Sequence, residues 1–283
     1  MSILLGNGNG TYTAQPSIAV GDALRSIIAA EFNGDRFVDL AVTSQGNEAV
    51  MVLLGNGDGT FTTQPSISTP GDPPYSLIAR DLDGDDILDL AVTKVSSNSI
   101  SVLLGDGDGT FTTQPDISVG ATPFSLVADD LDGDGYLDLA TANFSSHDAS
   151  VLLGNGDGTF TTQSTVALNR FPRSIATADL NGDGIVDLVT VEQYTDGISV
   201  LVGNGDGTFQ PKQSFQAGDL AVSITAGDFN GDGMIDLATA NTLGDNVSVL
   251  LNQCEVNCPG DIDGDQAVNV NDLLALIAAY GTI

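Results

Sequence analysis

A unit of about fifty residues repeats along this chain, and this repeat limits the possible folds more than any other feature of the sequence. One mark of the unit is a glycine-rich turn, which begins at Gly6, Gly55, Gly105, Gly154 and Gly203. A second mark is an acidic segment, which begins at Glu31, Asp81, Asp130, Asp179 and Asp228. Because both marks keep one period, we infer that a single structural unit has been copied along the chain.

Each unit contains four short stretches with the composition of β-strands. In the third copy they cover residues 125–130, 137–142, 149–153 and 159–167 and are rich in Val, Ile, Leu, Thr and Phe. Gly, Asn and Asp dominate the gaps, and residues 1–250 show no helical period. The sequence therefore predicts an all-β fold, a β-propeller in which each unit is a four-stranded blade.

The turn between the third and fourth stretches, GNGDGTF in most copies, predicts a tight hairpin. Its Asn-Gly and Asp-Gly pairs readily take positive φ. A phosphate-binding glycine loop would have to open a helix, whereas a strand follows this turn in every copy. We call it the glycine turn and expect no nucleotide there.

Ring closure admits two arrangements. Residues 2–5 and 11–18 have the pattern of a third and a fourth strand, while the last copy supplies strands at 223–228, 235–240 and 247–251. We expect residues 11–18 to complete the last blade and close a five-bladed ring. The surplus strand at 2–5 and the missing secretory signal also favour a second hypothesis, in which the chain is the C-terminal part of a longer secreted protein with more blades.

The acidic segments share one spacing of oxygen ligands, as in DLDGDGYLD at 130–138 and DFNGDGMID at 228–236. Side-chain oxygens fall at positions 1, 3, 5 and 9, and the carbonyl of position 7 can join them. Ca²⁺ takes about six to eight oxygen ligands from flexible segments, whereas Mg²⁺ demands stricter geometry with fewer protein ligands. We therefore predict a calcium site in each segment and call the segments acidic loops 1 to 5.

The predicted ligands, with position 7 acting through its carbonyl, are Glu31, Asn33, Asp35, Phe37 and Asp39 in loop 1; Asp81, Asp83, Asp85, Ile87 and Asp89 in loop 2; Asp130, Asp132, Asp134, Tyr136 and Asp138 in loop 3; Asp179, Asn181, Asp183, Ile185 and Asp187 in loop 4; and Asp228, Asn230, Asp232, Met234 and Asp236 in loop 5.

Two plainer explanations of the acids compete with calcium. Asp, Asn and Gly form turns, but a turn needs two or three such residues rather than oxygens at four repeated offsets. Halophilic acidity would scatter carboxylates over strand faces, whereas 21 of the 38 acids lie at ligand positions of these five loops and of a sixth loop near the C-terminus. Position 6 is glycine in loops 3 to 5, which permits positive φ. Arg36 and Asp86 replace it in loops 1 and 2, so we expect strain or weaker binding there, and Glu31 also departs from the pattern.

The acidic loop and the glycine turn together resemble the FG-GAP repeat, also called the VCBS repeat, over residues 2–251. This repeat forms the blades of integrin α-subunit propellers and of many bacterial secreted proteins. The resemblance implies a propeller, often of seven blades, with calcium between the first two strands of a blade and roles in adhesion or ligand binding. The five copies here depart from that usual blade number.

The C-terminal residues differ from the repeats. We divide the chain into a propeller at 1–252, a linker at 253–260 and a calcium loop with a short helix at 261–283. Cys254 and Cys258 in the linker favour a local disulfide over two free thiols. The tail resembles one half of a dockerin, which implies a possible cohesin-type partner; its predicted EF-hand-like calcium ligands are Asp261, Asp263, Asp265, the Ala267 carbonyl, Asn269 and Asp272.

The net charge of −31, with only 7 basic residues, excludes the basic patches that nucleic acid and anionic membrane surfaces require. No apolar run approaches the ~20 residues of a membrane span, so we expect no membrane insertion. Loops of this kind need high calcium to be filled, which favours an extracellular, secreted protein.

The loops on the other side of each blade vary between copies and offer a candidate ligand face. Its residues are Arg25, Tyr75, Phe124, Phe144, Arg173 and Tyr194, which could equally be packing residues at the ring centre. The single His147 has no repeated Ser or Cys partner, so we expect no enzyme. The leading hypothesis is a calcium-rigidified adhesion or interaction module that binds a protein or glycan; a lectin-like carbohydrate-binding module is the alternative, and a polysaccharide-active enzyme component comes third.

Overall fold

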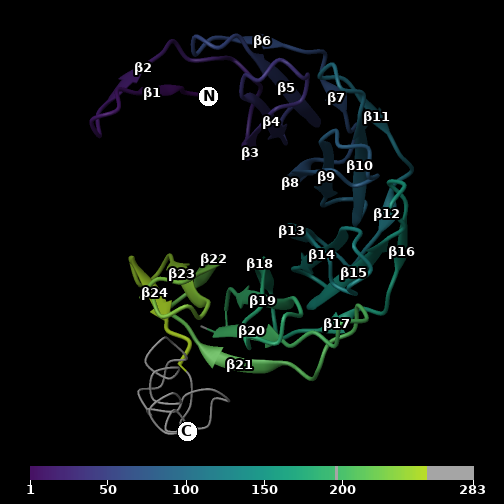
Figure 1. The fold of residues 1–283 in the computed structure, drawn as a ribbon, viewed down its shortest axis with the longest axis vertical. Helices are drawn as coiled ribbons and strands as arrows, with labels where there is room; N and C mark the ends of the chain where they lie inside the picture. Colours follow the sequence, from purple (N-terminus) through teal and green to yellow (C-terminus); the bar gives the residue numbers. More distant parts are fainter. Residues whose placement is uncertain (195–196, 254–283) are drawn as a thin grey trace, which may run out of the picture.

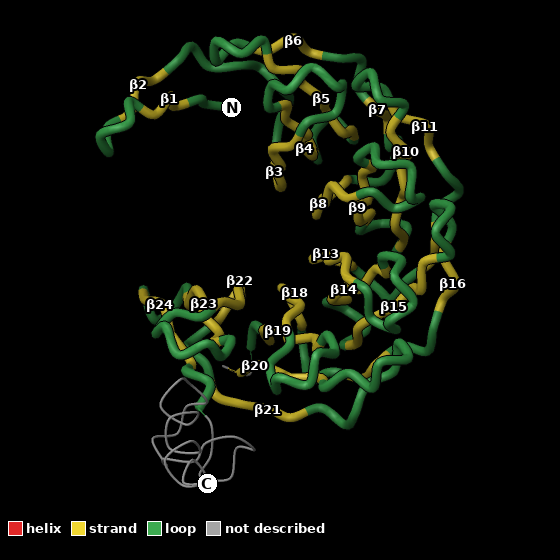
Figure 2. Tube along the Cα trace, viewed as in Figure 1, coloured by secondary structure: helices red, strands yellow, loops and turns green. Residues whose placement is uncertain are grey.

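The computed structural model describes residues 1–194 and 197–253, and these residues form a curved row of antiparallel sheets around an open centre (Figure 1). Strands and loops alternate along the whole described arc (Figure 2). Among these residues, no helix is long and apolar enough to span a membrane. The prediction of an all-β array of propeller blades is confirmed.

Four blades are complete, and each is a meander of neighbouring strands. Blade 1 contains β3 (Leu24–Ala30), β4 (Asp39–Ser44), β5 (Ala49–Gly55), β6 (Phe61–Thr63) and β7 (Ile67–Ser68). Blade 2 contains β8 (Pro74–Arg80), β9 (Asp89–Lys94), β10 (Ser99–Gly105), β11 (Phe111–Thr113) and β12 (Ile117–Ser118). Blade 3 contains β13 (Pro123–Asp129), β14 (Asp138–Asn143), β15 (Asp148–Gly154), β16 (Phe160–Thr162) and β17 (Val166–Ala167). Blade 4 contains β18 (Pro172–Ala178), β19 (Asp187–Glu192), β20 (Gly197–Leu201) and β21 (Gln213–Gln216).

The first strand of every blade lies at the inside of the arc and the fourth at its outer rim (Figure 1). In the four complete blades the second and third strands are largely buried, because neighbouring sheets cover both of their faces. The core is divided accordingly: one cluster joins Val50 and Val52 of blade 1 to Leu90 and Val92 of blade 2, and further clusters join the later blades. The apolar runs of the sequence therefore fill the spaces between blades.

The predicted fourth strand is two short strands in blades 1 to 3, for example β16 and β17, which both pair with β15. In blades 1 and 2 the break contains Pro65 or Pro115, which has no amide hydrogen for a ladder bond. The fourth strand can be divided because it lies at the outer rim, where it pairs with the third strand on one side only.

The expectation that residues 11–18 close a five-bladed ring is wrong. A hairpin of β1 (Leu4–Gly6) and β2 (Tyr12–Ala14) stands apart from the last sheet, which contains β22 (Ala221–Gly227), β23 (Asp236–Asn241) and β24 (Asn246–Leu250) (Figure 1). The physical reason is that apolar residues on either side of the hairpin, including Ile3 and Ile18, pack against the buried apolar residues of blade 1. The hairpin thus lies beside blade 1, where the outer strands of a neighbouring blade would lie.

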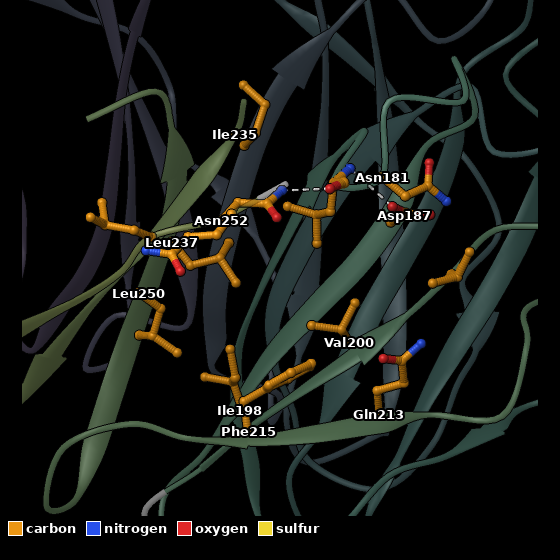
Figure 3. Close-up of a pocket in the computed structure, with 14 residues that line it drawn as sticks. Asn181, Asp187, Ile198, Val200, Gln213, Phe215, Ile235, Leu237, Leu250 and Asn252 are labelled. Atoms are coloured by element: carbon orange, nitrogen blue, oxygen red, sulfur yellow. Dashed lines mark hydrogen bonds between the residues drawn. The ribbon is translucent and has the colours of Figure 1, made fainter. Parts of the chain in front are cut away.

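No other described residues cover one face of the last sheet, and a pocket lies beside it. Val247 and Val249 are 66% and 52% exposed, although Ala149 and Val151, their equivalents in blade 3, are fully buried. Between blade 4 and this sheet lies a pocket of 360 Å³, lined among others by Ile198, Val200, Phe215, Leu237 and Leu250 (Figure 3). In blades 1 to 3 the glycine turn of the next blade packs against a leucine of the third strand.

The glycine turn forms a repeated contact between blades. A Cβ added at its third glycine would lie 2.7, 2.7, 2.8 and 2.7 Å from a leucine Cδ2 of the preceding third strand, in the pairs Gly59 with Leu5, Gly109 with Leu54, Gly158 with Leu104 and Gly207 with Leu153. These glycines also have positive φ, which L-residues rarely adopt. Glycine is therefore required both by backbone conformation and by the close approach of the neighbouring blade.

We predict that Gly158→Ala lowers the free energy of unfolding by about 1–3 kcal/mol, because it adds strain at positive φ and a contact with Leu104. Gly10→Ala is the matched control: Gly10 has the same place in the first glycine turn and a φ of 83°, but nothing lies within 4 Å of an added Cβ. Urea denaturation measures both changes. Equal losses in the two variants would contradict a contact that holds blades together.

Candidate metal centres and ligand face

Each acidic loop connects the first strand of a blade to the second, and its position 9 aspartate is the first residue of that second strand. These aspartates are almost completely buried, with exposed fractions of 0% or 1%. They are Asp39, Asp89, Asp138, Asp187 and Asp236. Position 9 is therefore part of the blade interior rather than of the exposed loop.

The buried aspartate binds backbone amides through both of its oxygens. In blade 3, Leu131 N donates to Asp138 Oδ2 at 2.8 Å and Gly154 N donates to Oδ1 at 2.7 Å. Position 2 of the loop and a residue at the end of the third strand or two residues beyond it supply the same two donors in the other sheets. The carboxylate thus joins the acidic loop to the end of the third strand.

The remaining oxygen side chains fold the loop around itself. In loop 3, Asp130 accepts hydrogen bonds from Gly133 N at 2.7 Å and Gly135 N at 3.0 Å. Asp132 Oδ1 accepts from Asp134 N at 3.1 Å, and Asp134 Oδ1 accepts from Tyr136 N at 2.8 Å. Loops 2, 4 and 5 repeat these bonds at positions 1, 3 and 5. Short local bonds therefore hold the carboxylates in place, as Asx turns do.

Positions 1, 3 and 9 converge. Ligand atoms of Asp81, Asp83 and Asp89 lie within 4.8 Å of one another, as do those of Asp130, Asp132 and Asp138. Asp85 and Asp134, at position 5, are outside these clusters. In loops 1, 4 and 5 the residue at position 3 is asparagine, whose amide oxygen can replace a carboxylate oxygen. Loops 2 and 3 are thus acidic clusters that could hold a metal ion.

The clusters are electrostatically unfavourable on their own. Burial raises the pKa of Asp89 and of Asp138 to about 6 and also raises that of Asp187. The pKa of Asp83 and of Asp132 is raised as well, first by desolvation and then by the neighbouring acid at position 5. A cation among these oxygens would relieve both causes, because an opposite charge favours the ionised carboxylate. The donor set, all oxygen, suits a hard cation such as Ca²⁺.

Position 6 has positive φ in every loop, including the two copies without glycine. Arg36 has a φ of 72° and Asp86 a φ of 66°. The expected strain in loops 1 and 2 is confirmed by these angles, since L-residues rarely adopt them. In loop 1 the longer Glu31 binds Asn33 N and Gly34 N through Oε1 alone, so its first position differs from the others.

A contact to the next blade escaped the sequence reasoning. Gly109 N donates to the Phe32 carbonyl at 3.0 Å, and Gly158 N and Gly207 N donate at 3.2 Å to the carbonyls of Leu82 and Leu131. These carbonyls belong to position 2 of the preceding acidic loop. At blade 4, Asn252 Nδ2 donates to the equivalent Leu180 carbonyl at 2.6 Å. The common period of acidic loops and glycine turns is the sequence signal of this coupling.

The acids of the glycine turns have a different role. Asp58, Asp108, Asp157 and Asp206 each accept hydrogen bonds from the backbone and hydroxyl of a threonine two residues later, and the hydroxyl bond is the main cause of their lowered pKa. The interpretation of this segment as a hairpin turn rather than a nucleotide loop agrees with the strands on both sides.

The predicted ligand-face residues lie at the ends of the strands opposite the acidic loops. The rings form a continuous row that we call the aromatic ladder: Tyr75 to Phe124 at 4.6 Å between centroids, Phe124 to Phe144 at 4.8 Å, Phe144 to Phe171 at 5.0 Å and Phe171 to Tyr194 at 5.1 Å. Arg25 lies 5.4 Å from the Tyr75 ring centroid and Arg173 lies 5.7 Å from that of Phe124. The structure therefore brings the six predicted residues into one row.

Phe171 is the member that sequence reasoning missed, although it is a large side chain where other copies carry Ala23 or Thr122. His147 supports this part of the ladder. Its Nδ1 accepts a hydrogen bond from Phe171 N at 3.1 Å, and its ring lies edge-on to the Phe171 ring at 4.7 Å. This position gives His147 a structural contact.

The predicted tail ligands, Asp261, Asp263, Asp265, Ala267, Asn269 and Asp272, lie outside the described residues, as do Cys254 and Cys258.

The FG-GAP-like repeat model matches residues 31–92, 81–141, 130–190 and 179–239 of this chain. The matched residues cover well over half of the sequence, so the chain belongs to the family of FG-GAP-like repeat proteins. No curated protein matches the sequence.

Solved structures share the fold at low sequence identity. A protein from Lactobacillus plantarum has a TM-score of 0.62 at 19% identity. The match covers 78% of this chain and 66% of that chain, so this chain spans just under two thirds of the length of the Lactobacillus plantarum protein. A candidate 6-phosphogluconolactonase from Bacteroides fragilis has a TM-score of 0.66 at 15% identity, over 88% and 72%. BBS1N, solved in complex with ARL6DN, has a TM-score of 0.60 at 14% identity, over 88% and 72%. At these identities the likeness concerns the fold alone.

Positions 9 and 3 should respond differently to substitution. We predict that Asp138→Asn lowers the free energy of unfolding by about 1–3 kcal/mol even in chelator, because the amide NH₂ leaves one buried backbone donor without an acceptor. Asp132→Asn is the matched control, since it removes a charge from the same cluster but one that repels its neighbours. Denaturant melts in chelator measure both. Equal destabilisation by the two variants would argue against the structural role of position 9.

Proposed function

We propose that this chain is a secreted, calcium-binding FG-GAP propeller module that acts in adhesion or another interaction and catalyses no reaction. The observation that carries the proposal is the pair of converging carboxylate clusters in loops 2 and 3, on the side of the blades opposite an aromatic ladder. A rigid scaffold with metal on one side and aromatic and arginine side chains on the other suits a partner-binding module.

Calcium would be held by the carboxylates of positions 1 and 3, or the asparagine amide oxygen in loops 1, 4 and 5, together with position 9 and the carbonyl of position 7. When bound, the ion supplies positive charge to a group of mutually repelling acids. Because the loop contacts the glycine turn of the next blade, calcium would stabilise the connection between blades as well as the loop. An extracellular setting supplies the calcium that such loops need.

The absence of catalysis remains part of the proposal, and two findings support it. His147 Nδ1 accepts a backbone hydrogen bond, so that nitrogen is not free to act as a base. The pocket in Figure 3 contains one ionisable residue, Asp187, and both of its oxygens accept backbone hydrogen bonds. The name of the Bacteroides fragilis protein raises lactone hydrolysis, but no acid and base pair meets in this pocket.

A lectin-like carbohydrate-binding module is the second candidate. The observation that favours it is Tyr194, which is 59% exposed at the end of the ladder and could stack on a sugar ring.

Calcium titration by calorimetry, with thermal melts in calcium and in chelator, tests the proposal. We expect calcium to raise the melting temperature strongly, because an ion that binds only the folded state adds about 2.7 kcal/mol per site at a hundredfold excess over its Kd. Binding should weaken as pH falls below about 6, since protons compete at Asp89 and Asp138.

The contribution of these two aspartates to the stability of the calcium-free protein should show the opposite dependence on pH. Because their pKa is raised on folding from 3.8 to about 6, this contribution in chelator is greatest below pH 3.8 and is lost as pH rises through about 6. Magnesium at equal concentration is the control ion. A melting temperature that calcium and chelator leave unchanged would refute the proposal.

A further inference from the structure

Among the described residues, two arginines on the ligand face have no acidic partner, in a chain of net charge −31. Arg25 Nε donates to Gln45 Oε1 at 2.5 Å, and Arg173 Nη1 donates to Gln193 Oε1 at 3.0 Å. The ion pairs of the described residues both belong to Lys94, with Asp72 and Asp116. A guanidinium carries five donor hydrogens and stays charged at any physiological pH. Each arginine therefore keeps most of its donors for another group.

The two arginines hold equivalent places in the repeat. Arg25 is the second residue of β3 in blade 1, and Arg173 is the second residue of β18 in blade 4. Each binds the glutamine that follows the second strand of its own blade. The residues at this place in blades 2 and 3 are Tyr75 and Phe124. The face thus reads arginine, tyrosine, phenylalanine, arginine across four blades, and each arginine lies over one of the two rings.

Three acids of this face are bonded within the chain, and three more, Asp22, Asp219 and Asp245, are exposed. Asp72 Oδ1 accepts from Ser96 N at 3.0 Å, and Asp148 Oδ1 accepts from Asn143 Nδ2 at 2.7 Å. Glu48 Oε2 accepts from Gly71 N at 2.6 Å. These bonds occupy the carboxylates of Asp72, Asp148 and Glu48, so they leave the arginine donors for a carboxylate that a partner brings. Exposed charges act over about 8 Å at physiological salt, so the distant acidic loops weaken this attraction little.

The arrangement of the rings favours a peptide over a sugar. Tyr75 and Phe124 are stacked with an angle of 23° between planes, and the arginines lie over the same rings. Stacking on a sugar requires an uncovered ring face, whereas ring edges and arginine forks suit apolar side chains and carboxylates. Arginine and tyrosine are also the residues that dominate protein interfaces.

We propose that the aromatic ladder with Arg25 and Arg173 binds an acidic peptide segment of a partner protein. Carboxylates of the segment lie on the two guanidinium groups, and its apolar side chains lie along the ladder. The proposal rests on the proposed interaction function and names the chemistry of the partner. It also makes Gln45 and Gln193 positioning residues, which hold the arginines through neutral hydrogen bonds.

The test uses a displayed library of random peptides, selected on the calcium-loaded chain and counter-selected on the Arg25→Gln, Arg173→Gln double variant. We expect enriched peptides that carry Asp or Glu beside apolar residues, and a Kd at least about tenfold weaker for each single variant. Arg80→Gln removes one charge beside acidic loop 2, at the other end of the strands, and should leave the Kd unchanged.

Three outcomes would overturn the proposal: no peptide preferred by the chain over the double variant, enriched peptides without acidic residues, or an equal loss in Arg80→Gln. Binding of uronic-acid glycans in place of peptides, lost in the same variants, would also overturn it and assign the face to carbohydrate. Thermal melts of every variant in calcium and chelator separate this failure from failure of the calcium proposal, because the variants should keep the calcium-dependent gain.

Discussion

The buried aspartate at position 9 of each acidic loop is the interaction on which the rest of the structure depends. Its two oxygens bind an amide of the loop and an amide at the end of the third strand, so one carboxylate fixes two connections of the same blade. Burial without a counter-charge raises the pKa of Asp89, Asp138 and Asp187, which is a cost that the fold retains in these three repeats. A cation held by positions 1 and 3 would offset this cost at the place where it arises.

The same loop also determines how one blade meets the next. The carbonyl of position 2 accepts a hydrogen bond from the glycine turn of the next blade. A leucine from the third strand of the same blade as the loop contacts that turn. Metal, loop, turn and next blade therefore form one chain of contacts along the arc. At the other end of the strands the side chains differ from blade to blade: the residue that accepts a hydrogen bond from an amide before the next blade is Glu48, Asn98 or His147.

Much of this architecture follows from the sequence, and the exceptions have physical causes. The period predicts the blades, and the spacing of Asp130 and Asp132 predicts their convergence. Residues 11–18 could not be placed by pattern, because every fourth strand carries nearly the same residues and only packing against blade 1 decides its position. Position 9 resembles positions 1 and 3 in the sequence, and only the folded chain separates the buried carboxylate from the loop acids. The ladder was predictable in its members except Phe171, but not in its continuity, which needs side-chain directions.

Amide hydrogen exchange with and without calcium tests the central claim most directly, that the acidic loops bind calcium and transmit its effect to the next blade. The account predicts that calcium slows exchange at Leu82 and Leu131 and also at Gly158 and Gly207, which belong to the glycine turns of the following blades. Exchange that calcium leaves unchanged at the loops, or slows at the loops but not at these glycines, would contradict it.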